Sequence, residues 1–258
     1  MSHDAPRAPL DRKRISSEIS QYWRVSVVEV TGSTQDDLYQ KVTTEVAKNS
    51  HNKTLIAAEY QSAGRGRLDR TFEAAPSSAL MFSLYVEPKV EKEEWSFLTL
   101  LAGLSVQEAL ASLDSTIAIG VKWPNDLLIG EKKCAGIIAQ ATDKGVVIGI
   151  GINVAMSVEE LPVDTATSLS IAGFSNLDRN SILAAIINHF EINLQMWELG
   201  DSFIARYKEA SVTIGKKVAV TIPAGEVIES EAVGISDTGS LLLSNGIEVT
   251  VGDVVHLR

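Results

Sequence analysis

Short apolar runs alternate with segments of helical spacing from about residue 15 to about residue 210. The runs are rich in β-branched residues and end at turn-forming residues, which predicts strands. They are Arg24–Val30, Thr54–Glu59, Ala79–Glu87, Ile117–Lys122, Leu127–Ile129, Cys134–Ala141 and Val146–Asn153. Apolar residues recur at helical spacing in Ser96–Leu113 and Ser181–Leu199, which predicts two long helices. Shorter helices are expected at 15–24 and at Thr34–Lys48, with Ser33 or Thr34 as the N-cap of the second.

The pattern changes near residue 212, after which strands are separated only by turns. The strand candidates there are Lys217–Ile222, Val227–Ile235, Leu241–Ser244 and Ile247–Val251. D-T-G at 237–239 and N-G at 245–246 are hairpin signals, because glycine and asparagine tolerate positive φ. Short strands joined by tight turns are typical of a small β-barrel. The sequence therefore predicts a flexible arm over 1–14, an α+β domain over 15–211 and an SH3-like barrel over 212–258.

Composition narrows the class of protein. Apolar residues make up 45% of the 258 residues, enough for a sizeable core. The net charge of -10 disfavours binding to nucleic acid or to anionic membranes. A single cysteine, Cys134, and an N-terminus without an apolar stretch indicate a cytoplasmic protein. The run Gly145–Met156 is too short to cross a bilayer as a helix, and four scattered histidines predict no metal site.

Three arginines and two glycines lie close together in the segment G-R-G-R-L-D-R at 64–70, directly after a predicted strand. Arginine forks onto phosphate or carboxylate oxygens, and glycine lets a ligand approach the backbone closely. We interpret the segment as an anion-binding loop, and the alternative is a solvated basic turn. It is not the phosphate loop of P-loop NTPases, because the pattern G-x-x-x-x-G-K-[ST] does not occur in the chain.

Three further segments carry candidate chemistry. K-W-P-N-D at 122–126 places the Lys122 ammonium beside an amide and a carboxylate, which suits charge stabilisation, or forms a surface turn around a packed tryptophan. G-I-G-I-N at 149–153 lacks the third glycine of a dinucleotide fingerprint, so its glycines indicate close approach of a ligand or of a neighbouring helix. K-C-A-G-I-I at 133–138 is predicted to enter the core, with Cys134 as a small buried residue.

Taken in order, these segments resemble the biotin protein ligase family. The series is G-S-T-Q at 32–35, Q-S-A-G-R-G-R-L-D-R at 61–70, K-W-P-N-D, K-C-A-G-I and G-I-G-I-N, followed by the small barrel. The resemblance runs from about residue 25 to the C-terminus. It implies the mixed β-sheet with helices of the biotin–lipoate ligase catalytic domain, which is similar to class II synthetases, plus the SH3-like barrel.

The resemblance also implies a two-step reaction. Biotin and Mg-ATP give biotinyl-5'-AMP and pyrophosphate, and biotin then passes to a lysine of a biotin carboxyl carrier domain. Catalysis is implied for Lys122, Arg67 and Arg65, because both reactants of the first step are anionic. Biotin binding is implied for Ser33, Thr34, Gln35, Gln61, Gly64, Arg65, Arg67, Lys122, Gly149 and Gly151. Nucleotide binding is implied for Arg65, Arg67, Arg70, Phe72, Lys122, Asn125 and Asn153.

The chain departs from the family's pattern at a few positions. Gln35 stands where asparagine is common, Phe72 where tryptophan is frequent and Cys134 where an aliphatic residue stands. About 24 residues precede the first predicted strand, so neither a helix-turn-helix domain nor repressor activity is expected. A monomer or weak homodimer is expected, without nucleic-acid or membrane partners. Mg²⁺ is expected to arrive with ATP, so no dedicated metal site is expected, although Asn125 and Asn153 are candidate contacts of the nucleotide or of its magnesium.

Some roles stay open at the level of the sequence. Asp126 is a candidate base for the transfer step, although a carboxylate in a turn is usually a hydrogen-bond cap. Lys216 and Lys217 could face the carrier or the nucleotide. The rival hypotheses are a lipoate or octanoyl transferase of the same fold, a nucleic-acid-binding module and a biotin-binding protein without catalysis. The segment G-R-G-R-L-D-R at 64–70, called the arginine loop below, favours the biotin ligase when it occurs together with K-W-P-N-D.

Overall fold

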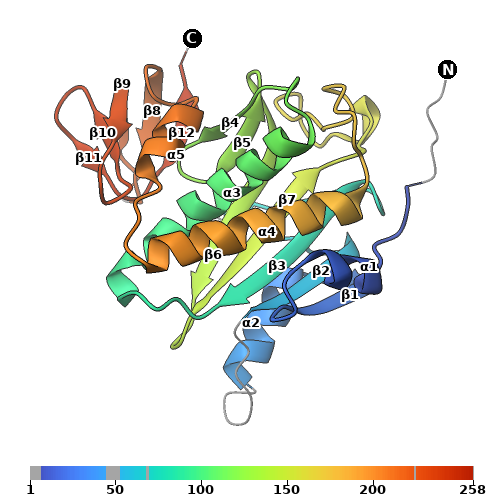
Figure 1. The fold of residues 1–258 in the computed structure, drawn as a ribbon. Helices are drawn as coiled ribbons and strands as arrows, with labels where there is room; N and C mark the ends of the chain where they lie inside the picture. The colour runs from blue at the N-terminus through green and yellow to red at the C-terminus, as the bar shows by residue number, and fades with distance from the viewer. Residues whose placement is uncertain (1–6, 45–52, 68–69, 224, 258) are drawn as a thin grey trace.

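The computed structural model describes residues 7–44, 53–67, 70–223 and 225–257, which form a seven-stranded sheet with helices and a five-stranded sheet (Figure 1). The strands of the larger sheet are β1 (Arg24–Thr31), β2 (Thr54–Gln61), β3 (Ala79–Val86), β4 (Ile119–Lys122), β5 (Asp126–Ile129), β6 (Lys132–Ala141) and β7 (Val146–Asn153). Their order is β1-β2-β3-β7-β6-β5-β4. β1 and β2 are parallel and the other neighbouring strands are antiparallel. The predicted α+β class with a mixed sheet is therefore confirmed.

Five short strands make the smaller sheet. They are β8 (Lys217–Thr221), β9 (Val227–Ile235), β10 (Leu241–Leu243), β11 (Glu248–Val249) and β12 (Asp253–His256). The order is β11-β10-β9-β8-β12, and all neighbours are antiparallel. Both predicted turns are present, with positive φ at Gly239 and Gly246. The last strand, β12, was not predicted, because four residues carry too little of an alternating pattern.

Helices cover both faces of the larger sheet. They are α1 (Arg12–Glu18), α2 (Thr34–Thr44), α3 (Phe97–Leu113), α4 (Arg179–Glu198) and α5 (Ile204–Ala210), with 3-10 turns η1 (Lys92–Ser96) and η2 (Val158–Glu160). α3 and α4 pack together on one face (Figure 1). On the other face, Leu38 and Val42 of α2 meet Ile56, Tyr85 and Val147. Because successive strand residues point to opposite faces, burial of both faces explains the unbroken apolar runs in the sequence.

The stretch Lys92–Leu113, which contains η1 and α3, is long and apolar enough to cross a membrane, with a mean hydropathy of 1.4. The apolar run Gly145–Met156 singled out in the sequence is a different segment, and most of it forms β7. Many residues of α3 are buried in the main core cluster, against the sheet and α4. A helix buried on most sides is apolar most of the way round, so core packing accounts for this composition.

The segment before β1 is packed from residue 7 onward. Asp11 is the N-cap of α1, which begins at Arg12 and ends at Glu18. The helix predicted at 15–24 therefore starts and ends earlier in the structure. Leu10 is buried, and its backbone N–H donates to Glu59 Oε1 at 2.5 Å. The contact between Leu10 and Glu59 joins residues far apart in the chain, so no local pattern reveals it. The predicted flexible arm over 1–14 is corrected from residue 7 onward, and its earlier residues lie outside the described ranges.

Other boundaries differ from the sequence predictions in detail. The strand expected from Ile117 begins at Ile119. The helix expected over Thr34–Lys48 is described as far as Thr44, and 45–48 lie outside the described residues. α5 was not predicted, because seven residues are too few for a clear helical period.

Candidate functional site

Glycines on neighbouring strands open a cavity on the face of the larger sheet that carries α2. Gly151 of β7 lies opposite Gly136 of β6. A Cβ on Gly149 would lie 2.7 Å from Gln35 Oε1, and a Cβ on Gly151 would lie 2.7 Å from the Phe72 ring. The glycines of G-I-G-I-N thus admit one side chain from a helix and one from the arginine loop. The space beside them is a cavity of about 120 Å³.

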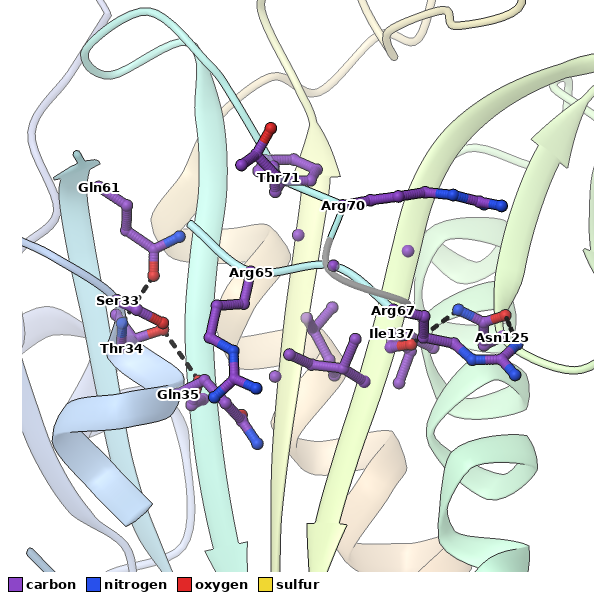
Figure 2. A pocket seen from close by; sticks show the side chains of 18 of the residues that line it. Ser33, Thr34, Gln35, Gln61, Arg65, Arg67, Arg70, Thr71, Asn125 and Ile137 are labelled. Atoms are coloured by element: carbon purple, nitrogen blue, oxygen red, sulfur yellow. Dashed lines mark hydrogen bonds between the residues drawn. The ribbon is translucent and has the colours of Figure 1, made fainter. Parts of the chain in front are cut away.

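Polar side chains gather at one end of this cavity, where α2 begins (Figure 2). Gln61 Oε1 accepts the backbone N–H of Thr34 at 2.7 Å, and Thr34 Oγ1 lies 2.9 Å from Ser83 Oγ. Gln35 Nε2 donates to the Val147 carbonyl at 3.1 Å. Gln35 Oε1 is buried and has no hydrogen-bond partner among the described residues. A buried acceptor is costly unless a ligand satisfies it, so this end suits an uncharged hydrogen-bond donor.

The arginine loop covers the cavity (Figure 2). It is closed at its base, where the Phe72 N–H donates to the Gly64 carbonyl at 2.8 Å. Arg65 reaches Asp36 in the first turn of α2, with Nη1 and Oδ1 2.5 Å apart. These side chains are 48% and 54% exposed, so their ion pair contributes little to stability. Arg65 can therefore exchange this carboxylate for a ligand anion at small cost.

On its other side, the loop contacts the K-W-P-N-D turn and the smaller sheet. Arg67 Nη1 donates to Asn125 Oδ1 at 2.8 Å, and Arg67 Nη2 donates to the Gly252 carbonyl at 3.0 Å. Arg70 pairs with Asp253 at 2.5 Å, which raises the pKa of Arg70. Burial lowers the pKa of Arg67. Its hydrogen-bond partners in the described part of the chain are neutral, so this half-buried cation is suited to receive an anion.

Two lysines approach the same end of the cavity. Lys122 at the end of β4 is in register with Asp126 of β5, and burial lowers the pKa of Lys122. Asp126 lines the cavity and pairs with Lys133, whose Nζ lies 2.5 Å from Oδ1. Lys133 also lines the cavity, whereas the segment K-C-A-G-I-I was predicted to enter the core. A β-bulge between β5 and β6 re-aims it, and such a bulge has no local sequence signal.

The cavity wall includes most of the residues predicted for the site. They are Ser33, Thr34, Gln35, Gln61, Arg65, Arg67, Arg70, Phe72, Asn125, Gly149 and Gly151. Lys122 is not part of this wall, although it is close enough to Asp126 and Lys133 for their charges to affect its pKa. Gly64 lines an adjoining groove of about 860 Å³, which shares the arginine loop with the cavity.

A few candidate residues lie away from both spaces. Asn153 Nδ2 donates to the Thr167 carbonyl at 2.8 Å, and Asn153 lines neither the cavity nor the groove. Lys216 and Lys217 are exposed near the start of β8 and line neither space. Cys134 is fully buried, and burial raises its pKa to about 12, in agreement with its predicted role as a small core residue.

Gly151→Ala is expected to displace the Phe72 ring and loosen the arginine loop. The new Cβ would lie 2.7 Å from that ring, and the ring can swing away more easily than the strand can move. Trypsin should therefore cleave the loop at its arginines faster than in the wild type. Gly103→Ala is the matched control, because its Cβ would have no neighbour closer than 3.6 Å. Equal cleavage of all three proteins would show that Phe72 does not hold the loop.

A hydrogen-bond chain joins the smaller sheet to the K-W-P-N-D turn. The Trp123 N–H donates to Thr213 Oγ1 at 3.1 Å, and His256 Nε2 lies 3.3 Å from the same oxygen. The Trp123 indole also donates to the Gly239 carbonyl at 2.9 Å. Burial lowers the pKa of His256 below its ordinary value of 6.5, and the nearby charges of Lys122 and Lys216 add to this.

The wild-type protein is expected to lose stability relative to His256→Gln as pH falls below 6.5, the ordinary histidine value. The unfolded chain binds the proton at a higher pH than the folded chain does, so protonation favours unfolding. Glutamine keeps a hydrogen-bonding group there but does not titrate. Urea unfolding of both proteins at about pH 7.5 and about pH 5.5 measures the difference. Parallel changes in the free energy of unfolding would exclude His256 as the cause.

The fold and site together define a class of protein. One end of the cavity offers uncharged hydrogen-bonding groups, and the other end offers arginine and lysine cations. Such a site fits a ligand with a polar head and an anionic end, as in ligases that activate a carboxylate. Residues 27–156 match the biotin/lipoate A/B protein ligase family, and residues 213–257 match the biotin protein ligase C terminal domain.

Similar proteins and solved structures narrow the class of protein to one family. The chain is 35% identical to the biotin–[acetyl-CoA-carboxylase] ligase of Mycobacterium tuberculosis, over 99% of this chain and 98% of that protein. It is 33% identical to the bifunctional ligase/repressor BirA of Escherichia coli, over 78% of this chain and 65% of that protein. The biotin protein ligase of Aquifex aeolicus in complex with biotin and ATP superimposes with a TM-score of 0.76 at 28% identity, covering 91% and 99% of the two chains. The chain belongs to the biotin protein ligase family, which confirms the resemblance found in the sequence.

Proposed function

We propose that this protein activates biotin with ATP to biotinyl-5'-AMP and then transfers biotin to a lysine of a biotin carboxyl carrier domain. The observation that carries the proposal is one continuous cavity, with the unsatisfied Gln35 acceptor at one end and Arg67 with Lys133 at the other. Biotin has the matching form, with a ring head that donates hydrogen bonds and a carboxylate at the end of an alkyl chain.

In the first step, a biotin carboxylate oxygen attacks the α-phosphorus of ATP, and pyrophosphate leaves. Ser33, Gln35 and Gln61 hold the ring head, which directs the carboxylate toward the cationic end of the cavity. Arg67 lies there and offsets the repulsion between carboxylate and phosphate. Lys122 supports the charge that develops in the transition state after a small movement toward the cavity.

We assign the nucleotide to the side of the cavity with Arg70, Phe72 and Asn125. Phe72 packs over Gly151 and would cover the bound adenylate, which protects the mixed anhydride from water. Asn153 would join this set only after exchanging its bond to the Thr167 carbonyl for one to the ligand. Mg²⁺ bound to ATP supplies further charge neutralisation. We assign it no protein ligand, because Asp126 and Asp253 on the cavity wall are each paired with a cation.

In the second step, the carrier lysine attacks the acyl carbon, and AMP leaves. We propose that the smaller sheet is an SH3-like barrel that helps to position the carrier, with Lys216 and Lys217 as candidate contacts. Asp126 remains the candidate base, and it lies on the cavity wall. It is paired with Lys133 in this structure, so it would have to be released before it could accept a proton.

The proposal also includes the protein's location, its oligomeric state and its class of partner. We place the protein in the cytoplasm, because its one cysteine is free and buried. We propose that it is a monomer or weak homodimer. The net charge of -10 supports a protein partner rather than nucleic acid or an anionic membrane. We also propose that the catalytic domain ends at residue 211 and that the SH3-like barrel begins at residue 212.

Incubation with biotin, Mg-ATP and a purified biotin carboxyl carrier domain tests the function directly. Mass spectrometry of the carrier should show the gain of one amide-linked biotin, dependent on ATP. Lipoate in place of biotin is the matched control, because the family name also covers lipoate ligases. A carrier modified with lipoate alone would overturn the proposal. Without any modification, biotinyl-adenylate in the mixture would point to another carrier, and its absence would contradict the biotin assignment.

A further inference from the structure

We propose that Glu59 is a positioning residue for the proposed reaction, because it fixes Ser77, at the point where the chain returns from the arginine loop to the sheet. The inference rests on the proposed function. Glu59 belongs to β2 and lines neither the cavity nor the adjoining groove. It therefore acts on the ligand only through the loop that covers the cavity.

The Glu59 carboxylate accepts hydrogen bonds from three separate parts of the chain. Oε1 accepts the backbone N–H of Leu10 at 2.5 Å. Oε2 accepts the Ser77 hydroxyl at 2.9 Å and the Arg179 guanidinium at 2.7 Å. Burial alone would raise the pKa of Glu59, but these bonds outweigh it, and the pKa lies below its ordinary value of 4.5. The carboxylate is therefore charged at neutral pH and binds all three donors at once.

Arg179 fixes the direction of this carboxylate. The Arg179 side chain is 2% exposed, and its guanidinium also donates to the carbonyls of Ala8 at 2.8 Å and Ala79 at 3.3 Å. Ala79 is the first residue of β3, so the same guanidinium contacts the strand that follows the loop. A buried ion pair is costly to break, because the remaining charge is left without a partner. Glu59 and Arg179 thus form a fixed point beside the start of β3.

Ser77 is attached to this fixed point in a backbone conformation that serine rarely adopts, with φ of 58°. Its backbone N–H donates to the Glu59 carbonyl at 3.1 Å, in addition to the bond between its hydroxyl and the Glu59 carboxylate. A residue keeps such a conformation only where its surroundings impose it. Both bonds are made to Glu59, so Glu59 imposes the turn that leads into β3.

The turn at Ser77 limits the movement of the arginine loop. Only residues 73–76 separate Ser77 from Phe72, which packs over Gly151 and closes the base of the loop through its bond to the Gly64 carbonyl. A short connection can follow its fixed end only over a small distance. A loop already held near its bound position loses little conformational freedom on binding, so the ligand is retained longer. Release of Ser77 should therefore shorten that retention.

Ser77→Ala tests this inference, because it removes the hydroxyl and leaves the pair of Glu59 with Arg179 intact. Biotinyl-adenylate is expected to dissociate about 5- to 10-fold faster, since a hydrogen bond to a charged group is lost. The KM for biotin should rise while kcat changes less. Trypsin should also cleave the ligand-free protein faster at the arginines of the loop. Ser77→Asn should restore part of the retention, because asparagine tolerates positive φ and its amide can donate to the carboxylate.

Ser105→Ala is the matched control, because it also removes a buried serine hydroxyl with its hydrogen bonds. Ser105 lies in α3, donates to the Leu101 carbonyl, and lines neither the cavity nor the groove. Adenylate dissociation and cleavage of the loop should stay as in the wild type, and thermal unfolding of each variant records any loss of stability. Unchanged dissociation in Ser77→Ala would overturn the role of Glu59, and so would the same acceleration in Ser105→Ala.

Glu59→Gln supplies a second test of the same contact. The neutral amide cannot bind all three donors as the carboxylate does, so retention of the adenylate should fall at least as far as in Ser77→Ala. Adding Ser77→Ala to Glu59→Gln should then cause little further loss, because the bond between them is already weakened. Fully additive losses would show that Ser77 does not act through Glu59. A wild-type protein that forms no adenylate would instead remove the proposed function, whereas cleavage by trypsin would still report on the attachment of the loop.

Discussion

Arg67→Ala is expected to lower the single-turnover rate of biotinyl-adenylate formation by about 100- to 1000-fold. Arg67 bridges the arginine loop to Asn125 and to the Gly252 carbonyl, and it lines the cavity. Its partners are neutral, so its charge is the one most available to an incoming carboxylate or phosphate. Removing that charge leaves two anions facing each other in a partly buried site, where repulsion is screened less than in water.

Rapid-quench measurement of the adenylate checks this expectation, with the thermal stability of the variant measured in parallel. Arg12→Ala is the matched control, because Arg12 is exposed in α1 and lines neither the cavity nor the groove. Arg67→Lys distinguishes charge from geometry: lysine restores a cation but cannot make both of the bonds that the guanidinium makes. A rate for Arg67→Ala within about threefold of the wild type would contradict the assigned role of the loop.

Lys122→Met is expected to lower the same rate by a similar factor, about 100-fold or more. Lys122 is half-buried at the end of β4, and burial lowers its pKa from the ordinary lysine value of 10.5. If its ammonium supports the transition state, the wild-type rate should decline as pH rises through this lowered pKa. The methionine variant should lack that decline, because it has no proton to lose.

The pH profile separates a direct role of Lys122 from a structural one. A variant that is slow but keeps the alkaline decline would show that another group titrates, and an unchanged rate would exclude Lys122 from the chemistry. Lys144→Met is the control, because Lys144 is exposed in the turn before β7.

The sequence by itself determined the family, the α+β class and most of the strands. Motifs such as G-S-T-Q and G-R-G-R-L-D-R are contiguous, and each specifies local geometry and chemistry, so they can be read without the fold. The larger sheet was predictable because its strands are buried on both faces and therefore form unbroken apolar runs. The alternating pair Gly149 and Gly151 also indicated a close approach to the backbone, and a Cβ at either position would clash with a neighbouring side chain.

Only the tertiary structure decided which of these residues meet. Lys133 was read as a core residue because a strand pattern does not reveal the bulge that turns it to the cavity. Asn153 was expected at the nucleotide, but the loop that brings Thr167 to it comes from later in the chain. The segment from residue 7 was expected to be free, yet Leu10 is held by Glu59. The difference at Lys133 comes from a bulge in the pairing of two adjacent strands, and those at Asn153 and Leu10 come from contacts between residues far apart in the chain. Such features form only when the chain packs, and no local pattern of hydrophobicity or charge encodes them.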